Sequence, residues 1–112
     1  MTRVPSPAVL RSQELDAFLK SQNCDEKIRK WIDNMEAVLK ENMYAGTLIK
    51  KKHIPSKYIQ RYGVNNLSRY RHAEGYRSCY TILHVEGIGR CPIILDIMPH
   101  DEYDRIFGYR KK

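Results

Sequence analysis

Several features that define common protein classes are missing from this sequence of 112 residues. Its aliphatic runs are short, such as Ile93–Leu95, and none approaches the length needed to span a bilayer. No apolar segment follows Arg3 to form a secretory signal. The sequence also has no zinc-ligand spacing, phosphate-binding glycine loop or nucleophile elbow. We therefore expect a cytoplasmic protein without a membrane partner.

Cysteine is scarce, and the three cysteines have no metal-ligand spacing. An odd number of cysteines without such a pattern is typical of reduced thiols in a cytosolic protein. If Cys79 and Cys91 lie on neighbouring antiparallel strands, the turn between them places Cys79 opposite a residue near Asp96. The two sulfurs would then be too far apart for a disulfide.

The composition is that of one globular domain with a surplus of positive charge. The apolar fraction is 42% and the charged fraction 29%, which is ordinary for a folded protein. Twenty Lys and Arg residues against thirteen Asp and Glu residues give a formal charge of +7. Such a surplus favours a polyanionic partner, such as nucleic acid, the ribosome or an acidic protein. The alternative is charge that serves only solubility.

Two helices are expected in the first half of the chain. Residues 10–21 place Leu15, Phe18 and Leu19 on one side of a short helix. Asn23 is the predicted cap of a longer helix, with Glu26 as its capping-box partner. Apolar residues recur in that helix at three- and four-residue spacing, which predicts an amphipathic helix on an apolar core. They are Ile28, Trp31, Ile32, Met35, Val38 and Leu39.

A basic segment with interleaved tyrosines follows Gly46. Such a composition suits a loop that faces nucleic acid, since cations contact phosphates and aromatic rings stack on unpaired bases. A solvated connector is the alternative. The candidate RNA-binding residues here are Lys50, Lys51, Lys52, Lys57 and Arg61.

The rest of the chain reads as three strands joined by tight turns. Gly75 can adopt the positive φ that the first turn needs. Apolar residues on both faces of the last strand indicate an interior position. The expected elements are strand 68–72, turn 73–75, strand 76–85, turn 86–89 and strand 92–98, followed by a tail or short helix from His100.

Two helices followed by these strands resemble the RelE/ParE superfamily of toxin–antitoxin toxins. The motifs are Leu-x-Arg-Tyr-Arg over 67–71 and Gly-Tyr-Arg-x-x-Tyr over 75–80, then an aliphatic strand that leads to His100 and Tyr103. The resemblance covers about residues 25–109. It implies a small curved antiparallel sheet with two N-terminal helices packed on one face. It also implies one RelE-like domain over 1–112, with an N-terminal extension of about 1–22 and a basic tail of about 105–112.

Function is likewise implied by this resemblance. RelE-like members cleave messenger RNA, usually on the ribosome, whereas ParE-like members inhibit DNA gyrase and have no nuclease activity. Members of either branch are normally neutralised by an antitoxin, here expected to be acidic. Cleavage of RNA without a metal or other cofactor needs a base for the 2′-hydroxyl, cations for the phosphorane and an acid for the leaving oxygen.

The candidate catalytic residues divide these tasks. Arg71 and Arg77 suit the phosphate, because a guanidinium binds two oxygens at once. His100 is the candidate base or acid, because imidazole groups titrate near neutral pH. Tyr103 could donate a proton or stack on a base, and Arg69 joins the lysines of 50–52 as a candidate RNA contact.

Structural alternatives stand beside each assignment. Arg71 and Arg77 could pair with Asp96 or Asp101 and only stabilise the sheet. His100 could cap the C-terminal segment, and Tyr103 could be a core residue. A non-catalytic ParE-like inhibitor, and an RNA-binding domain that uses residues 50–61, are the alternative functions. His53, His72 and His84 form no recognisable constellation and are expected to be structural or surface residues.

Overall fold

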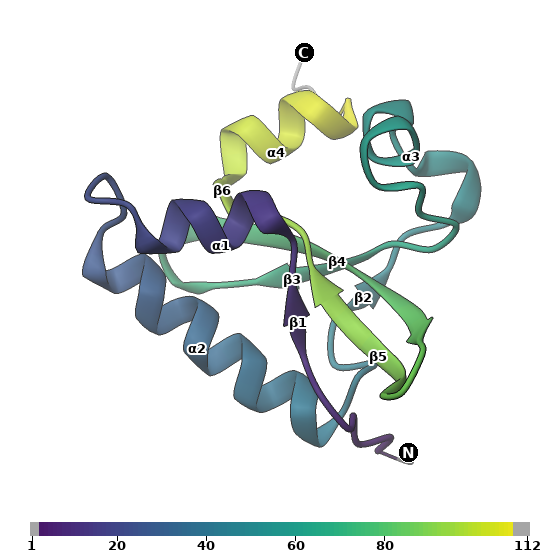
Figure 1. Ribbon diagram of the computed structural model, residues 1–112. Coiled ribbons are helices and arrows are strands. Elements are labelled where there is room, and N and C mark those ends of the chain that lie inside the picture. The colour runs from purple at the N-terminus through teal and green to yellow at the C-terminus, as the bar shows by residue number, and fades with distance from the viewer. Residues whose placement is uncertain (1–2, 109–112) are drawn as a thin grey trace.

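The computed structural model describes residues 3–108 and confirms the predicted α+β class (Figure 1). Its elements are β1 (Leu10–Arg11), α1 (Gln13–Lys20), α2 (Glu26–Glu41), β2 (Thr47–Leu48), η1 (Lys51–His53), α3 (Ser56–Tyr62), β3 (Ser68–Arg71), η2 (Ala73–Gly75), β4 (Tyr76–Val85), β5 (Gly89–Ile94), β6 (Met98–Pro99) and α4 (His100–Phe107). No helix among these residues combines the length and the apolar composition that crossing a membrane requires.

The strands form a single mixed sheet in the order β1-β5-β4-β3-β2, and β6 pairs with β4 beyond the end of β5. All pairs are antiparallel except β1 with β5. The expectation of a purely antiparallel sheet is therefore corrected at this edge. Leu10 lies beside Ile93, so the residues expected to form an N-terminal extension supply an edge strand and a helix of the domain.

The two N-terminal helices pack on one face of the sheet, as predicted (Figure 1). Ile32, Met35 and Leu39 of α2 are fully buried against Tyr80 and Ile82 of β4. The amphipathic spacing therefore identified these three residues of α2 correctly, but Val38, expected on the same side, is 40% exposed. The predicted cap was wrong, because α2 begins at Glu26 and the side chain of Asp25, not Asn23, accepts the hydrogen bond from the backbone N–H of Lys27.

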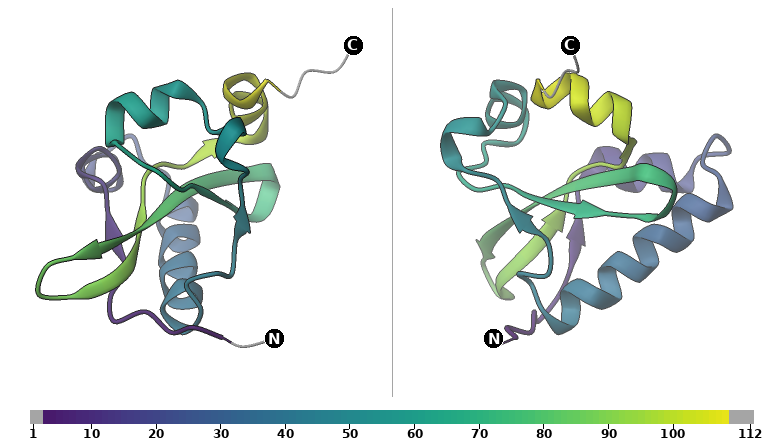
Figure 2. Two further views of the ribbon diagram at one scale, coloured as in Figure 1. Left: turned by 90° about the vertical axis from the view of Figure 1, so that its right-hand side faces the viewer. Right: turned by 180° about the vertical axis from the view of Figure 1, so that it is seen from behind.

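A second helical layer of α3 and α4 covers the opposite face of the sheet (Figure 2). Helix α4 is the short helix that was one of the two expectations from His100, whereas the sequence did not indicate α3. The basic segment 50–61 was expected to be a loop, but it forms η1 and α3. Tyr58 of α3 is fully buried in a cluster with Cys79 of β4 and Tyr103 of α4. Burial of the tyrosine provides the stabilisation that a seven-residue helix lacks by itself.

The last predicted strand, 92–98, is interrupted. β5 ends at Ile94, and β6 resumes at Met98. Between them the side chain of Asp96 replaces a backbone partner, because its Oδ1 accepts a hydrogen bond of 2.9 Å from the N–H of Cys79. The interruption shifts the alternation, so that Leu95 packs with α3 and α4 whereas Ile97 packs with α1 and α2.

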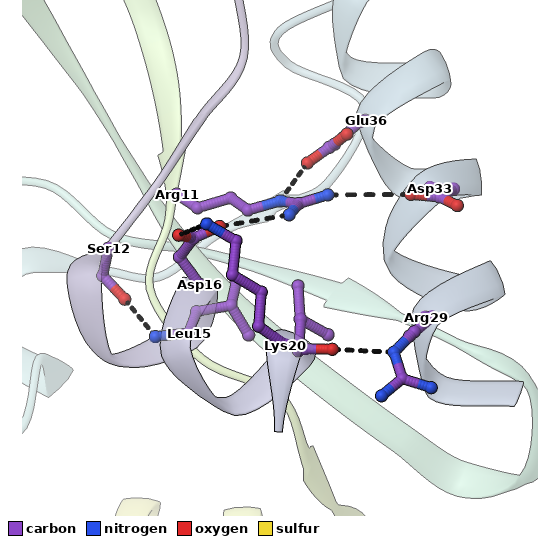
Figure 3. Close-up of polar contacts among 9 residues, drawn as sticks. Arg11, Ser12, Leu15, Asp16, Lys20, Arg29, Asp33 and Glu36 are labelled. Carbon is purple, nitrogen blue, oxygen red and sulfur yellow. Dashed lines mark hydrogen bonds and ion pairs between the residues drawn. The ribbon is translucent and has the colours of Figure 1, made fainter. Parts of the chain in front are cut away.

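A network of ion pairs connects β1, α1 and α2 (Figure 3). The Arg11 guanidinium donates to Glu36 at 2.6 Å and lies 3.4 Å from Asp16 and 3.6 Å from Asp33. The hydrogen bond with Glu36 is the main cause of a raised pKa of Arg11. Arg29 of α2 donates to the carbonyl oxygen of Leu19 at 2.7 Å. These contacts fix the N-terminal segment to the helix that packs on the sheet.

Candidate functional site

The candidate site lies at the tip of the hairpin formed by β3 and β4. Arg71, the last residue of β3, is directly opposite Arg77 in the register. The turn between them has positive φ at Glu74 (57°) and Gly75 (80°), which confirms the predicted tight turn. Directly opposed residues of antiparallel strands point to the same face. The hairpin therefore places both guanidinium groups on the face that also carries α3 and α4.

His100 is brought to this tip by β6. Met98 pairs with Arg77 and Pro99 with Tyr76, so α4 begins beside the hairpin. The imidazole packs against Gly75, where a Cβ atom would lie 2.8 Å from His100 Cδ2. The Arg77 guanidinium donates to the carbonyl oxygen of the same Gly75 at 3.0 Å. His100 and Arg77 thus both contact Gly75.

The cluster is open to solvent. The His100 side chain is 60% exposed, and its Nδ1 lies 3.8 Å from a carboxylate oxygen of Asp104. Arg71 is exposed, and the described residues give it no hydrogen bond or ion pair. Arg77 contacts only backbone carbonyls in the same part of the chain. Two cations and an imidazole are therefore available to an external anion.

The structure does not pair Arg71 or Arg77 with Asp96 or Asp101, which was the structural alternative for the two arginines. Asp96 is half-buried, accepts from Cys79 N–H, and accepts a second hydrogen bond of 2.5 Å from the Tyr58 hydroxyl. Burial raises the pKa of Asp96. Asp101 accepts from the backbone N–H of Glu102. Among residues 3–108, neither carboxylate forms an ion pair with Arg71 or Arg77.

Tyr103 has a different position from the one expected of a proton donor. Only 2% of the residue is exposed, and its ring stacks on Phe107 with centroids 4.2 Å apart. It belongs to the core between the sheet and α4. A phenol buried in this way offers no ring face to a base, so we assign Tyr103 to packing and not to the chemistry.

Arg69 lies next to the cluster, two residues before Arg71 on the same strand. The β-strand alternation places its side chain on the same face as Arg71 and Arg77. Its Nε is buried and has no hydrogen-bond partner within the described residues. Of the residues expected to contact RNA, Arg69 is thus the one that the sheet brings beside the candidate catalytic pair.

The remaining candidate RNA contacts lie elsewhere. Leu48 pairs with Ser68, so the chain leaves β2 near the beginning of β3, whereas Arg71 is at its end. The lysines of 50–52 follow this point and are exposed. Lys57 and Arg61 line a cavity of about 210 Å³ together with acidic residues, and Arg61 forms an ion pair of 3.2 Å with Glu14. The structure therefore does not join these cations to the arginine cluster.

Aromatic contacts between α2 and the hairpin hold the site in place, and they were not foreseen. Trp31 of α2 packs on Tyr76 and His72 with centroid distances of 5.0 and 6.4 Å. Lys27 of α2 lies 3.2 Å from Glu74 in the turn. Trp31 was expected from its helical spacing to be a core residue, but no local signal identified the hairpin as its partner.

Comparison with known proteins gave no family assignment: no family model matches the sequence, and neither a curated protein nor a solved structure is significantly similar to it. Within the described part of the chain, no group of three or more His, Cys, Asp and Glu side chains is placed to hold a metal ion. The arrangement of Arg71, Arg77 and His100 around Gly75 is the feature from which a function can be inferred.

Proposed function

We propose that this protein is a RelE-like endoribonuclease that cleaves messenger RNA without a metal ion, on the ribosome. The observation that supports it is the meeting of Arg77 and His100 at Gly75, with Arg71 directly opposite Arg77. The two N-terminal helices on one sheet face and the tight hairpin agree with the fold that the RelE/ParE resemblance implies. An acidic antitoxin is the expected partner.

The proposed reaction is a transesterification within the RNA. The ribose 2′-oxygen forms a bond to phosphorus as the bond from phosphorus to the 5′-oxygen breaks, which leaves a 2′,3′-cyclic phosphate and a 5′-hydroxyl. Arg71 and Arg77 bind the non-bridging oxygens, whose negative charge grows in the transition state. His100 accepts the proton of the 2′-hydroxyl or donates one to the 5′-oxygen. Solvent, to which the cluster is open, exchanges the other proton.

A cleavage assay with matched variants tests this proposal. End-labelled single-stranded RNA is incubated with the protein, both alone and on translating ribosomes, and the fragment ends are analysed. We expect Arg77→Ala to slow cleavage about 10²- to 10³-fold, because one preorganised donor to the charged oxygen is lost. His100→Ala should slow it about 10²- to 10⁴-fold.

Arg90→Ala is the control, since Arg90 is exposed and pairs with His84 near the opposite end of β4. It should cleave at the wild-type rate. RNA that stays intact with wild-type protein in both settings would refute the proposal.

Binding without cleavage is the second candidate function. The burial of Tyr103 favours it, because the phenol expected to share in the proton transfers lies in the core. Tight, salt-sensitive binding of intact RNA would support this reading. The ParE-like alternative predicts DNA damage signals with intact transcripts in cells that produce the protein.

A further inference from the structure

On the hairpin face Arg69 and Arg77 are both half-buried, but only Arg77 has hydrogen-bond acceptors among the described residues. The Nε–H of Arg69 is fully covered yet has no acceptor among residues 3–108. A buried donor without an acceptor is costly, and native proteins rarely retain one without a reason. The side chain also lacks an ion pair within these residues, so its positive charge is not neutralised internally.

The neighbours of Arg69 offer it no anion. Thr47 lies across from it on β2 and Cys79 on β4. Burial raises the pKa of the Cys79 thiol well above its usual value, so the thiol stays neutral. Asp96, which is hydrogen-bonded to Cys79, accepts from Cys79 and Tyr58 and forms no ion pair with Arg69. Arg69 thus has no acceptor within residues 3–108, and an anion from outside can bind the part of the half-buried side chain that solvent reaches.

The spacing of the arginines indicates what kind of acceptor fits. Arg69 and Arg71 are two residues apart on one strand, so their Cα atoms are separated by roughly 6.7 Å. This separation is comparable to the step between consecutive phosphorus atoms of an extended nucleic acid strand. Three guanidinium groups on adjacent positions of one face repel one another unless anions lie between them. A chain of phosphates meets that need at each position.

We infer that Arg69 binds the phosphate adjacent to the one held by Arg71 and Arg77, so that the hairpin face binds two consecutive phosphates of single-stranded RNA. This inference rests on the proposed function for the identity of the first phosphate. It makes Arg69 a binding residue for a neighbouring linkage, with no part in bond breaking. The site then requires a substrate with at least two phosphates.

Short non-cleavable oligonucleotides test the inference. Affinity is measured by competition against a labelled RNA, using 2′-O-methyl oligomers that contain either one or two internal phosphates. Charge-assisted hydrogen bonds to a second phosphate should give the wild-type protein at least a tenfold preference for the two-phosphate oligomer. Arg69→Met should bind both oligomers alike, with an affinity for the one-phosphate oligomer within about twofold of wild type.

The thermal midpoint of unfolding separates binding from a structural role. Met replaces the guanidinium with an apolar group of similar length and removes the buried unpartnered donor, so Arg69→Met should unfold at or above the wild-type temperature. If Arg69 only stabilises the sheet, Arg69→Met should instead lower the midpoint of unfolding. The variant should then also bind both oligomers more weakly, by the same factor, and these two results together would overturn the inference.

Two further outcomes are decisive. If Arg69→Met keeps the wild-type preference for two phosphates, Arg69 does not bind the second one. Hexaglutamate is compared with the two-phosphate oligomer as a competitor of the labelled RNA. If hexaglutamate displaces the RNA at the lower concentration in wild-type protein but not in Arg69→Met, Arg69 binds a protein carboxylate and the inference fails. Absence of cleavage refutes only the proposed function. The preference for two phosphates and its dependence on Arg69 are measured with non-cleavable oligomers and do not depend on cleavage.

Discussion

His72 is half-buried at the point where the chain leaves β3. Its ring lies between Trp31 and Tyr70, and its Nε2 is 2.7 Å from the hydroxyl oxygen of Ser78. Burial among these groups lowers the pKa of His72 from 6.5 to about 4. The expectation that His72 is structural agrees with this position. The neutral ring helps to fix the strand that ends in Arg71.

Stability should therefore depend on pH through His72. Its pKa is lower in the folded than in the unfolded state, so its contribution is complete above pH 6.5 and is lost as the pH falls toward 4. After allowance for partial exposure to solvent, we expect the loss to be about 1–2 kcal/mol between pH 7 and 4.5. Urea unfolding at the two pH values measures it.

Comparison with His72→Phe isolates this effect from that of the carboxylates, which titrate in the same range. The variant should be less stable than wild type at pH 7, because it leaves the Ser78 hydroxyl without its partner. The difference between the two proteins should shrink at pH 4.5. The exposed His84 provides the control, since His84→Gln should leave the profile unchanged. A constant difference across the range would contradict the assignment.

At the scale of elements, the N-terminal helices act on the site through the hairpin. Helix α2 contacts the hairpin tip through Trp31 and Lys27, while Arg11 of β1 connects α1 and α2 (Figure 3). The guanidinium of Arg11 is 28% exposed and lies among three carboxylates. Removing it leaves those charges without their common partner.

Arg11→Met should therefore destabilise the fold. The network is intermediate between an exposed and a buried ion pair, so we expect a loss of about 1–3 kcal/mol, measured by urea unfolding at pH 7. Arg3→Met is the matched control, since the Arg3–Glu41 pair is 74% exposed on both sides and its loss should cost no more than about 0.5 kcal/mol. Equal stability of the two variants would show that the Arg11 network contributes nothing beyond a surface pair.

At the scale of the whole molecule, some cations have a carboxylate partner and others have none. Many acidic residues pair with nearby cations, as in the Arg11 network and in the Arg61–Glu14 pair. The arginines of the hairpin face have no carboxylate partner within residues 3–108. These arginines account for part of the surplus of +7, and a polyanion bound to them would release counterions.

RNA binding should consequently weaken with salt in a predictable way. Two phosphates on a single strand, one bound by Arg71 and Arg77 and the other by Arg69, give a slope of about −1.4 for log K against log salt concentration. Arg69→Met should reduce the steepness by about 0.7, because it removes the contact with the second phosphate, whereas Arg90→Ala should leave it unchanged. Fluorescence anisotropy with 2′-O-methyl RNA between 50 and 200 mM salt, roughly the range in which such effects are large, provides the measurement. A flat dependence in wild-type protein would argue against phosphate contacts altogether.

Local sequence determined the parts of this fold that depend on short-range interactions. The bounds of β4, the turn at Gly75 and the opposition of Arg71 to Arg77 were all predictable, because a tight turn fixes the register of the two strands that it joins. The buried side of α2 was predictable from its 3.6-residue period. The predicted placement of these arginines on one face followed from the same hairpin register.

Tertiary structure alone decided the rest, because the deciding contacts join residues far apart in the chain. A segment that reads as a basic loop forms the helix α3, because Tyr58 is buried in the core and its hydroxyl donates to Asp96. Tyr103 is taken into the same core, while His100, three residues earlier, stays at the surface beside Gly75. Composition and spacing cannot distinguish such neighbours, because burial depends on which distant side chains complete the packing.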